Sequence, residues 1–162
     1  MANGSETLPP AARRIQDLLG EIGHDGKVRL FDASTRTAAD AAAAIGCEVA
    51  QIAKSLIFRA MQSDAPVLVI ASGINRVDET KIAAALGEKL GKADANFVRE
   101  RSGFAIGGVA PIGHREPPIV FIDRDLLAYE EIWAAAGTPQ AVFPLHPADL
   151  ENMTGGRVID IK

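Results

Sequence analysis

Two features of the chain could do chemistry: a lysine at the start of an apolar run and a glycine-rich stretch that ends in a histidine. Lys54 opens the run KSLIFRA, and residues 102–114 read SGFAIGGVAPIGH. Glycine permits positive φ and close approach of the backbone to a ligand, whereas proline fixes φ. We therefore expect a stiff loop that presents main-chain N–H groups. Lys54 could supply a cation beside a carboxyl, a phosphate or a developing oxyanion.

Each polar side chain that could take part in chemistry also has an ordinary structural interpretation. A lysine at a strand mouth is usually a solvated strand end, and a loop histidine such as His114 usually lies on the surface. Asp123 ends PPIVFID, where an aspartate commonly caps the next turn, here DRDLL. Ser72 in ASG has no histidine or acid partner at a familiar spacing. From the residues alone, both interpretations stay open.

The sequence lacks the motifs of the common catalytic classes. His24, His114 and His146 are far apart, and there is no HExxH or CxxC. GxGxxG, GxSxG and GxxxxGK[ST] are also missing, and IGGVAPIG lacks the lysine of a nucleotide phosphate cradle. We therefore expect no metal and no cofactor. Catalysis would rest on main-chain donors and on Lys54, Asp123 or His114.

Composition is typical of one globular domain covering residues 1–162, with 48% hydrophobic and 23% charged residues. The single cysteine, Cys47, cannot form an internal disulfide, which favours a reducing, cytoplasmic setting. No apolar run is long enough to span a membrane, and the N-terminus MANGSETLPP has no signal-peptide pattern. We expect no membrane association.

Charge is distributed unevenly along the chain. The overall net charge is −4, which argues against a general nucleic-acid coat and against DNA as a partner. Counted by segment, it is −2 over residues 1–53, +3 over 54–115 and −5 over 116–162. The basic middle segment contains the glycine-rich loop, and a mild positive field there suits a small polyanionic feature. Scattered solvated charges would give the same distribution.

Hydrophobic periodicity predicts short helices alternating with strands. Thr37 or Thr35, Asp78 and Asp94 are expected helix caps. The fold class is α+β or mixed α/β: a single compact domain with a mixed sheet of about six or seven strands and short helices packed on it. The predicted helices cover 7–23, 37–46, 78–87, 94–103 and 147–156, and the strands 27–32, 54–60, 66–72, 117–123, 130–137, 140–145 and 157–161.

An ordered set of motifs resembles the YbaK/prolyl-tRNA-synthetase-associated domain family, free-standing relatives of the editing insertion of bacterial prolyl-tRNA synthetase. The resemblance covers the chain from about residue 25 to its end. Each motif is weak alone, and their order and spacing make the match specific. The motifs are IAKSLIFR, VLVIASGINRVDETKIAAALG, VRERSGFAIGGVAPIGH, PIVFID and PADLENMTGGRVIDI.

The resemblance implies trans-editing, the hydrolysis of the ester between a wrong amino acid and a tRNA. The family lysine corresponds to Lys54, its next polar position to Ser55, and its GxxxP loop to Gly107 through Pro111. His114 follows that loop in some branches, whereas others carry an amide there. The cysteine-directed branch has a serine-containing YVSGGKRG where this chain reads WAAAGTPQ, which weakens an assignment to cysteine editing.

These residues have a consistent role in ester hydrolysis. The N–H groups of Gly107 and Gly108 would stabilise the oxyanion, and each such donor is worth about 3 kcal/mol of barrier. Lys54 would hold a phosphate or ribose edge of the tRNA, or steady the oxyanion. Strands 54–60 and 67–72 and the segment from Phe31 to Thr37 are expected to wall the pocket. The expected substrate-binding residues are Ser55, Phe31, Thr37, Ser72, Gly73, Pro111, His114 and Asp123.

The expected partner is the acceptor end of a mischarged tRNA, typically proline tRNA, with prolyl-tRNA synthetase as a further partner. The wrong amino acid would be small: Ala, Cys, Ser, Thr or 2-aminobutyrate. A small pocket that excludes proline would act as a second sieve, since one methylene is worth only about 1–3 kcal/mol. Two alternatives stay open: a non-catalytic tRNA- or synthetase-binding module, and a small-molecule esterase or amidase.

Overall fold

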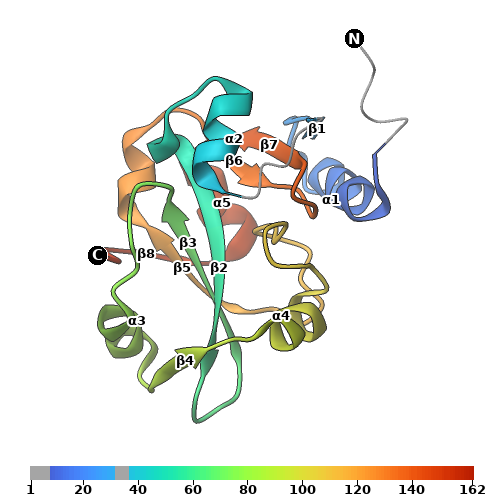
Figure 1. The fold of residues 1–162 in the computed structure, drawn as a ribbon. Coiled ribbons are helices and arrows are strands. Elements are labelled where there is room, and N and C mark those ends of the chain that lie inside the picture. The colour runs from blue at the N-terminus through green and yellow to red at the C-terminus, as the bar shows by residue number, and fades with distance from the viewer. Residues whose placement is uncertain (1–7, 32–36) are drawn as a thin grey trace.

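The fold is built on one mixed β-sheet flanked by helices (Figure 1). The computed structural model describes residues 8–31 and 37–162. Two short 3-10 helices, Val49–Gln51 before β2 and Arg124–Ala128 after β5, lie between the longer elements. The helices are α1 (Pro10–Glu21), α2 (Ala38–Ile45), α3 (Glu79–Leu86), α4 (Ala95–Ser102) and α5 (Pro147–Thr154). The strands are β1 (Arg29–Leu30), β2 (Ile52–Ala60), β3 (Pro66–Ser72), β4 (Leu90–Lys92), β5 (Ile119–Asp123), β6 (Ile132–Ala135), β7 (Ala141–Leu145) and β8 (Arg157–Ile159).

Within the described residues the sheet has eight strands in the order β1-β7-β6-β2-β3-β5-β8, and β4 also pairs with β2. β2 and β3 form an antiparallel hairpin at its centre. The other edge of β2 is shared: β6 pairs in parallel with Ile52 and Ala53, and β4 pairs antiparallel from Phe58 onward. This shared edge positions the site described below.

The core occupies both faces of the sheet, and β3 shows why. Its seven residues, PVLVIAS, are all buried. Successive side chains of a strand point to opposite faces. Leu68 and Ile70 therefore pack in the cluster that includes Ile15 of α1, while Val67 and Val69 pack in the cluster that includes Ile82 of α3. Such a strand reads as one continuous apolar run in the sequence.

The sequence predicted this architecture correctly, and the structure adds one strand. The mixed sheet with short helices is confirmed, and Thr37, Asp78 and Asp94 cap their helices through side-chain oxygens. Thr35 lies outside the described residues. The short strand β4 was not predicted, because LGK is too short and too rich in glycine to show a strand pattern.

Candidate functional site

An apolar cavity of about 440 Å³ lies beside β2. Residues 52–58 of β2 line it, together with parts of β6, helix α2 and the glycine-rich loop. Among the described residues, 54–57 have no strand neighbour on this edge of β2, because β6 pairs only as far as Ala53 and β4 begins at Phe58. The opposite walls are formed mainly by apolar side chains: Ala93, Val98, Ile106, Val109, Trp133 and Val142.

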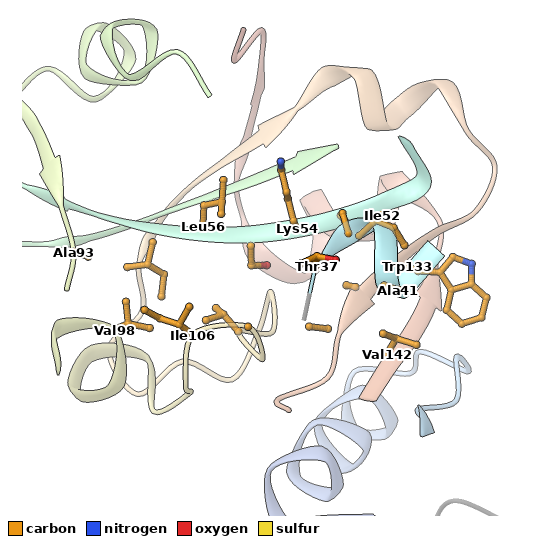
Figure 2. A pocket seen from close by; sticks show the side chains of 18 of the residues that line it. Thr37, Ala41, Ile52, Lys54, Leu56, Ala93, Val98, Ile106, Trp133 and Val142 are labelled. Carbon is orange, nitrogen blue, oxygen red and sulfur yellow. The ribbon is translucent and has the colours of Figure 1, made fainter. Parts of the chain in front are cut away.

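A second hollow of about 410 Å³ involves the same strand. It is lined by Leu56, Phe58, Val77 and Glu79 together with two cations, Lys54 and Arg76. Figure 2 shows why Lys54 contributes to both hollows: its side chain and that of Leu56 project to one side of β2, whereas Val98 and Ile106 lie on the other. β2 therefore lies between the apolar cavity, called the chamber below, and the second hollow, whose cations Lys54 and Arg76 are called the cationic rim.

The electrostatic environment of Lys54 is that of a half-buried cation near a second one. Burial lowers the pKa of Lys54, Arg76 lowers it further, and Asp123 opposes both. A cation that is partly desolvated and repelled by a neighbour gains when an anion binds beside it. Lys54 and Arg76 are thus neighbouring cations on a hollow that Glu79 also lines.

Three further predicted residues line the apolar cavity: Ser55, Thr37 and Gly107. The Ser55 hydroxyl oxygen is buried and has no hydrogen-bond partner among the described residues. Thr37 is exposed, and its hydroxyl caps α2 by accepting from the Asp40 N–H at 3.1 Å. Gly107 has φ +95°, a conformation that favours glycine. Its N–H meets no acceptor in residues 8–31 and 37–162.

The rest of the glycine-rich loop is occupied with its own structure, which corrects three expectations. Gly108 does not line the cavity: its N–H donates to the Ala105 carbonyl at 3.0 Å, and an added Cβ would lie 2.8 Å from Thr138 Cα. Pro111 is buried away from the cavity. The His114 ring bonds the Ala110 carbonyl through Nε2 at 2.6 Å.

His114 is therefore a packing residue of the loop. Its ring lies edge-on to Phe104 with centroids 5.4 Å apart. Burial lowers the pKa of His114, the hydrogen bond to Ala110 opposes this, and Arg14 lowers it again. Arg14 also donates to the Gly113 carbonyl, so helix α1 holds the same loop. These contacts keep the imidazole out of the cavity.

Three more predicted substrate-binding residues, Asp123, Ser72 and Gly73, lie away from the cavity. Asp123 is buried and accepts from the Ser72 N–H at 2.9 Å, the Asn75 amide at 2.8 Å and the Asp125 N–H at 2.9 Å. This confirms its role as a cap of the next turn. The Ser72 hydroxyl donates to the Ala50 carbonyl at 2.7 Å. A Cβ on Gly73 would clash with the Val49 carbonyl, so this glycine permits close packing of two main chains.

The predicted walls also need correction. Phe31 packs with the cluster of Ala41, Ile52 and Trp133 instead of lining the cavity, and residues 32–36 lie outside the described part of the chain. Strand 67–72 forms no wall, because β2 pairs beside it and lies between it and the open edge that borders the cavity. Reasoning from sequence missed Val98, Trp133, Val142 and Arg76. The apolar ones look like any core residue, and only the tertiary structure shows that they surround a hollow.

Neither a metal centre nor a membrane span is found in the part of the chain that the structure describes. No group of three or more His, Cys, Asp and Glu side chains there could hold a metal ion. No described helix has the length and apolar character needed to cross a bilayer.

Comparison with known proteins relates the chain to one family and to several proteins. The family described as "Aminoacyl-tRNA editing domain" matches residues 32–153. The uncharacterized protein YwhH of Bacillus subtilis (strain 168) is 33% identical over 138 residues, covering 85% of this chain and 87% of that protein. The proline–tRNA ligase of Limosilactobacillus fermentum is 35% identical over 111 residues, which cover 65% of this chain and 19% of the ligase.

Solved structures show the same fold over nearly the whole chain. One is described as "a putative trans-editing enzyme for prolyl tRNA synthetase"; it is 47% identical, with a TM-score of 0.90, and the match covers 96% of this chain and 98% of that one. Another, used as a scaffold for epitope grafting, is 44% identical with a TM-score of 0.89, and the match again covers 96% of this chain and 98% of that one. The solved structures that share this fold include one described as a "putative trans-editing enzyme", which agrees with the family that the sequence matches.

Proposed function

The chain belongs to the aminoacyl-tRNA editing domain family, and from this premise we propose that it is a deacylase of mischarged tRNA. Water adds to the carbonyl carbon of the aminoacyl ester, and the bond from that carbon to the ribose oxygen breaks. The products are a free amino acid and a tRNA with its terminal hydroxyl restored. The substrate we propose is proline tRNA carrying a small wrong amino acid: Ala, Ser, Thr, Cys or 2-aminobutyrate.

The observation that carries this proposal is the pair of hollows that meet at Lys54. An aminoacyl-tRNA end has a small side chain next to a ribose and a phosphate, so it needs an apolar chamber beside a cationic rim. Here Val98, Ile106 and Val109 supply part of the chamber, and Lys54 with Arg76 supply the rim. A bound phosphate would relieve the repulsion between the two cations.

Lys54 acts in this proposal on the tRNA and not on the oxyanion. Figure 2 places its ammonium on the side of β2 away from Ile106, whereas the ester must reach the chamber. This favours the phosphate or ribose edge among the roles that the sequence left open. Lys54 then positions the ester, and an ester positioned in this way needs much less activation than a free one.

Gly107 is the loop residue that we propose as an oxyanion donor. It lines the chamber, and its N–H has no acceptor in the described part of the chain. A fixed N–H directed at a developing oxyanion is worth about 3 kcal/mol of barrier. The terminal ribose hydroxyl or solvent would assist the attacking water, because His114 and Asp123 are both engaged elsewhere.

A deacylation panel tests this function. One proline tRNA is charged in turn with Ala, Ser, Thr, Cys, 2-aminobutyrate and Pro, and release of amino acid is followed with micromolar protein. We expect release of at least one small amino acid and slow release of proline. If every ester stays intact while charged and uncharged tRNA bind equally well, the deacylase proposal fails and the chain is a binding module.

A further inference from the structure

The main-chain groups of β2 point alternately to its two edges. The Ala60 N–H donates to the Ala65 carbonyl across the hairpin at 2.9 Å, and the Met61 N–H donates to the Lys89 carbonyl on the β4 side, also at 2.9 Å. The β2–β3 register runs from Ala53 to Arg59 without a bulge. The N–H and C=O of one strand residue share an edge, and its neighbours use the other. Residues 53, 55, 57 and 59 therefore direct these groups to the edge shared by β4 and β6.

Ser55 lies at the centre of the gap in that edge. β6 pairs no further than Ala53, and β4 begins at Phe58. Consequently the N–H and carbonyl of Ser55, and the N–H of Ile57, meet no protein partner in residues 8–31 and 37–162. Main-chain polar groups that are shielded from water are nearly always paired in folded proteins. The gap opens on the apolar cavity, where Ser55 and Ile57 are both lining residues.

We propose that the aminoacyl group of the substrate binds to Ser55 as a one-residue antiparallel β-strand. The α-ammonium donates to the Ser55 carbonyl, and the ester carbonyl accepts from the Ser55 N–H. These are the two bonds exchanged by a hydrogen-bonded pair in an antiparallel sheet. This inference rests on the proposed deacylase function and adds what that function leaves open: which protein groups recognise the common backbone of the amino acid.

The pairing also places the reacting atom. The ester carbonyl oxygen becomes the oxyanion when water adds, so the Ser55 N–H would stabilise it. Gly107 lines the same cavity, and its N–H would be a second donor. Both donors are main-chain groups. Ser55 is thus a catalytic residue through its amide and not through its hydroxyl.

The same geometry assigns a direction to the amino acid side chain. Residues opposite each other in an antiparallel pair place their side chains on one face of the sheet. The substrate side chain would therefore lie on the face of the Ser55 side chain, within the apolar walls. The Ser55 hydroxyl, which has no partner among the described residues, lies on that face, and rotation about χ1 would bring it within reach of a bound group.

Backbone ester substitution tests the proposal directly. In the full-length protein, Ser55 is replaced by its α-hydroxy acid, so that an ester oxygen replaces the N–H while the side chain stays. The matched control is the same replacement at Ile57, whose N–H faces the same gap but is not used. Both replacements weaken one neighbouring carbonyl that faces β3, so their effects on stability should be alike; thermal unfolding checks this.

We expect kcat for alanyl-tRNA to fall about 10²-fold with the Ser55 replacement, and to stay within about threefold of wild type with the Ile57 replacement. A substrate arm uses propionyl-tRNA, which lacks the ammonium. Each enzymatic rate is divided by the uncatalysed hydrolysis rate of the same ester, since the α-ammonium also activates the ester by itself. On this scale wild type should prefer alanyl- to propionyl-tRNA by about tenfold or more, because the Ser55 carbonyl loses a charged donor.

The deacylase function and the strand pairing with Ser55 fail in different ways. If the unmodified protein releases no amino acid from any tRNA, the deacylase function itself is wrong. If wild type is active but the Ser55 and Ile57 replacements have equal effects, or propionyl-tRNA is cleaved as fast as alanyl-tRNA, strand pairing with Ser55 is wrong and the deacylase function stands.

Discussion

Strand β2 and the glycine-rich loop both border the cavity, yet they contribute to it in different ways. Seven consecutive residues of β2, 52–58, line the cavity, and the strand also forms the cationic hollow behind it. From residues 102–114 only Ile106, Gly107 and Val109 line it. The remaining loop residues are used to hold the loop: Gly108 against Thr138, and His114 against Ala110 and Phe104.

The difference shows that a conspicuous motif need not be the part that touches the ligand. Glycine, proline and histidine at close spacing mark an unusual backbone, and most of that backbone serves to place Gly107. An open strand edge has no motif, because its chemistry is in the main chain. Substitutions in β2 should therefore lower catalysis, whereas most substitutions in the loop should lower stability.

The largest effect is expected from Lys54→Ala. Loss of the cation that positions the tRNA phosphate should lower kcat/KM for aminoacyl-tRNA by about 10²-fold. Because Lys54 is only half-buried and its pKa is already lowered by burial, the melting temperature should not fall. Steady-state deacylation and thermal unfolding measure the two. Lys92→Ala, an exposed lysine on β4, is the control and should retain activity; equal losses in both variants would remove the special role of Lys54.

The second-largest loss of activity is expected from Gly107→Ala, and Gly103→Ala is its matched control. Both glycines have positive φ, +95° for Gly107 and +85° for Gly103. Alanine should therefore destabilise the protein at either position by about 1–2 kcal/mol. Only Gly107 lines the cavity, so deacylation should fall about tenfold more for Gly107→Ala than for Gly103→Ala. Urea unfolding gives the stability loss and kcat gives the activity loss. Similar activity in the two variants would reduce Gly107 to a turn residue.

His114→Gln should alter stability and leave the chemistry unchanged. Losing the bond to the Ala110 carbonyl should cost about 1 kcal/mol, while kcat should stay within about twofold of wild type. Burial lowers the pKa of His114 in the folded state. Wild type therefore loses stability as pH falls through the unfolded-state pKa and towards the folded one. Melting temperatures between pH 8 and pH 5 should show a larger decline in wild type than in the variant. A loss of kcat with unchanged stability would return His114 to the active site.

The smallest effect concerns the pH dependence of tRNA binding. The pKa of Lys54 is lowered chiefly by burial, so binding to a phosphate should begin to weaken at a lower pH than an ordinary lysine would allow. Arginine keeps its charge throughout this range. From pH 7 to 9.5, the Kd for uncharged tRNA should therefore rise about two- to threefold more in wild type than in Lys54→Arg. Parallel pH profiles would mean that Lys54 does not bind the phosphate.

Much of the fold was predictable from the sequence, because its signals are local. The apolar run of β3 and the capping residues Thr37, Asp78 and Asp94 depend on near neighbours, and the structure confirms them. Strand β4 is held by pairing with β2, and it was missed because its three residues have little propensity of their own.

The candidate site was predictable only in part. Lys54, Ser55, Thr37 and Gly107 do line one cavity, whereas Phe31, Ser72, Gly73, Gly108, Pro111, His114 and Asp123 do not. Ser72 and Asp123 are polar residues bonded in the interior: the Ser72 N–H donates to the Asp123 carboxylate, and the Ser72 hydroxyl donates to the Ala50 carbonyl. From the sequence alone, such buried polar residues resemble a functional cluster. The gap between β4 and β6 depends on where two distant strands end, and no local pattern encodes that.

An amide chemical-shift titration shows most directly whether the aminoacyl group binds at the open edge of β2. The ligand is a non-hydrolysable analogue of the tRNA end, an adenosine that carries alanine through a 3′-amide. We expect the Ser55 and Gly107 amide signals to shift most and those of Gly108 and His114 to shift little. If the largest shifts centre on His114 and Gly108 and Ser55 stays unchanged, the aminoacyl group does not bind at the open edge of β2.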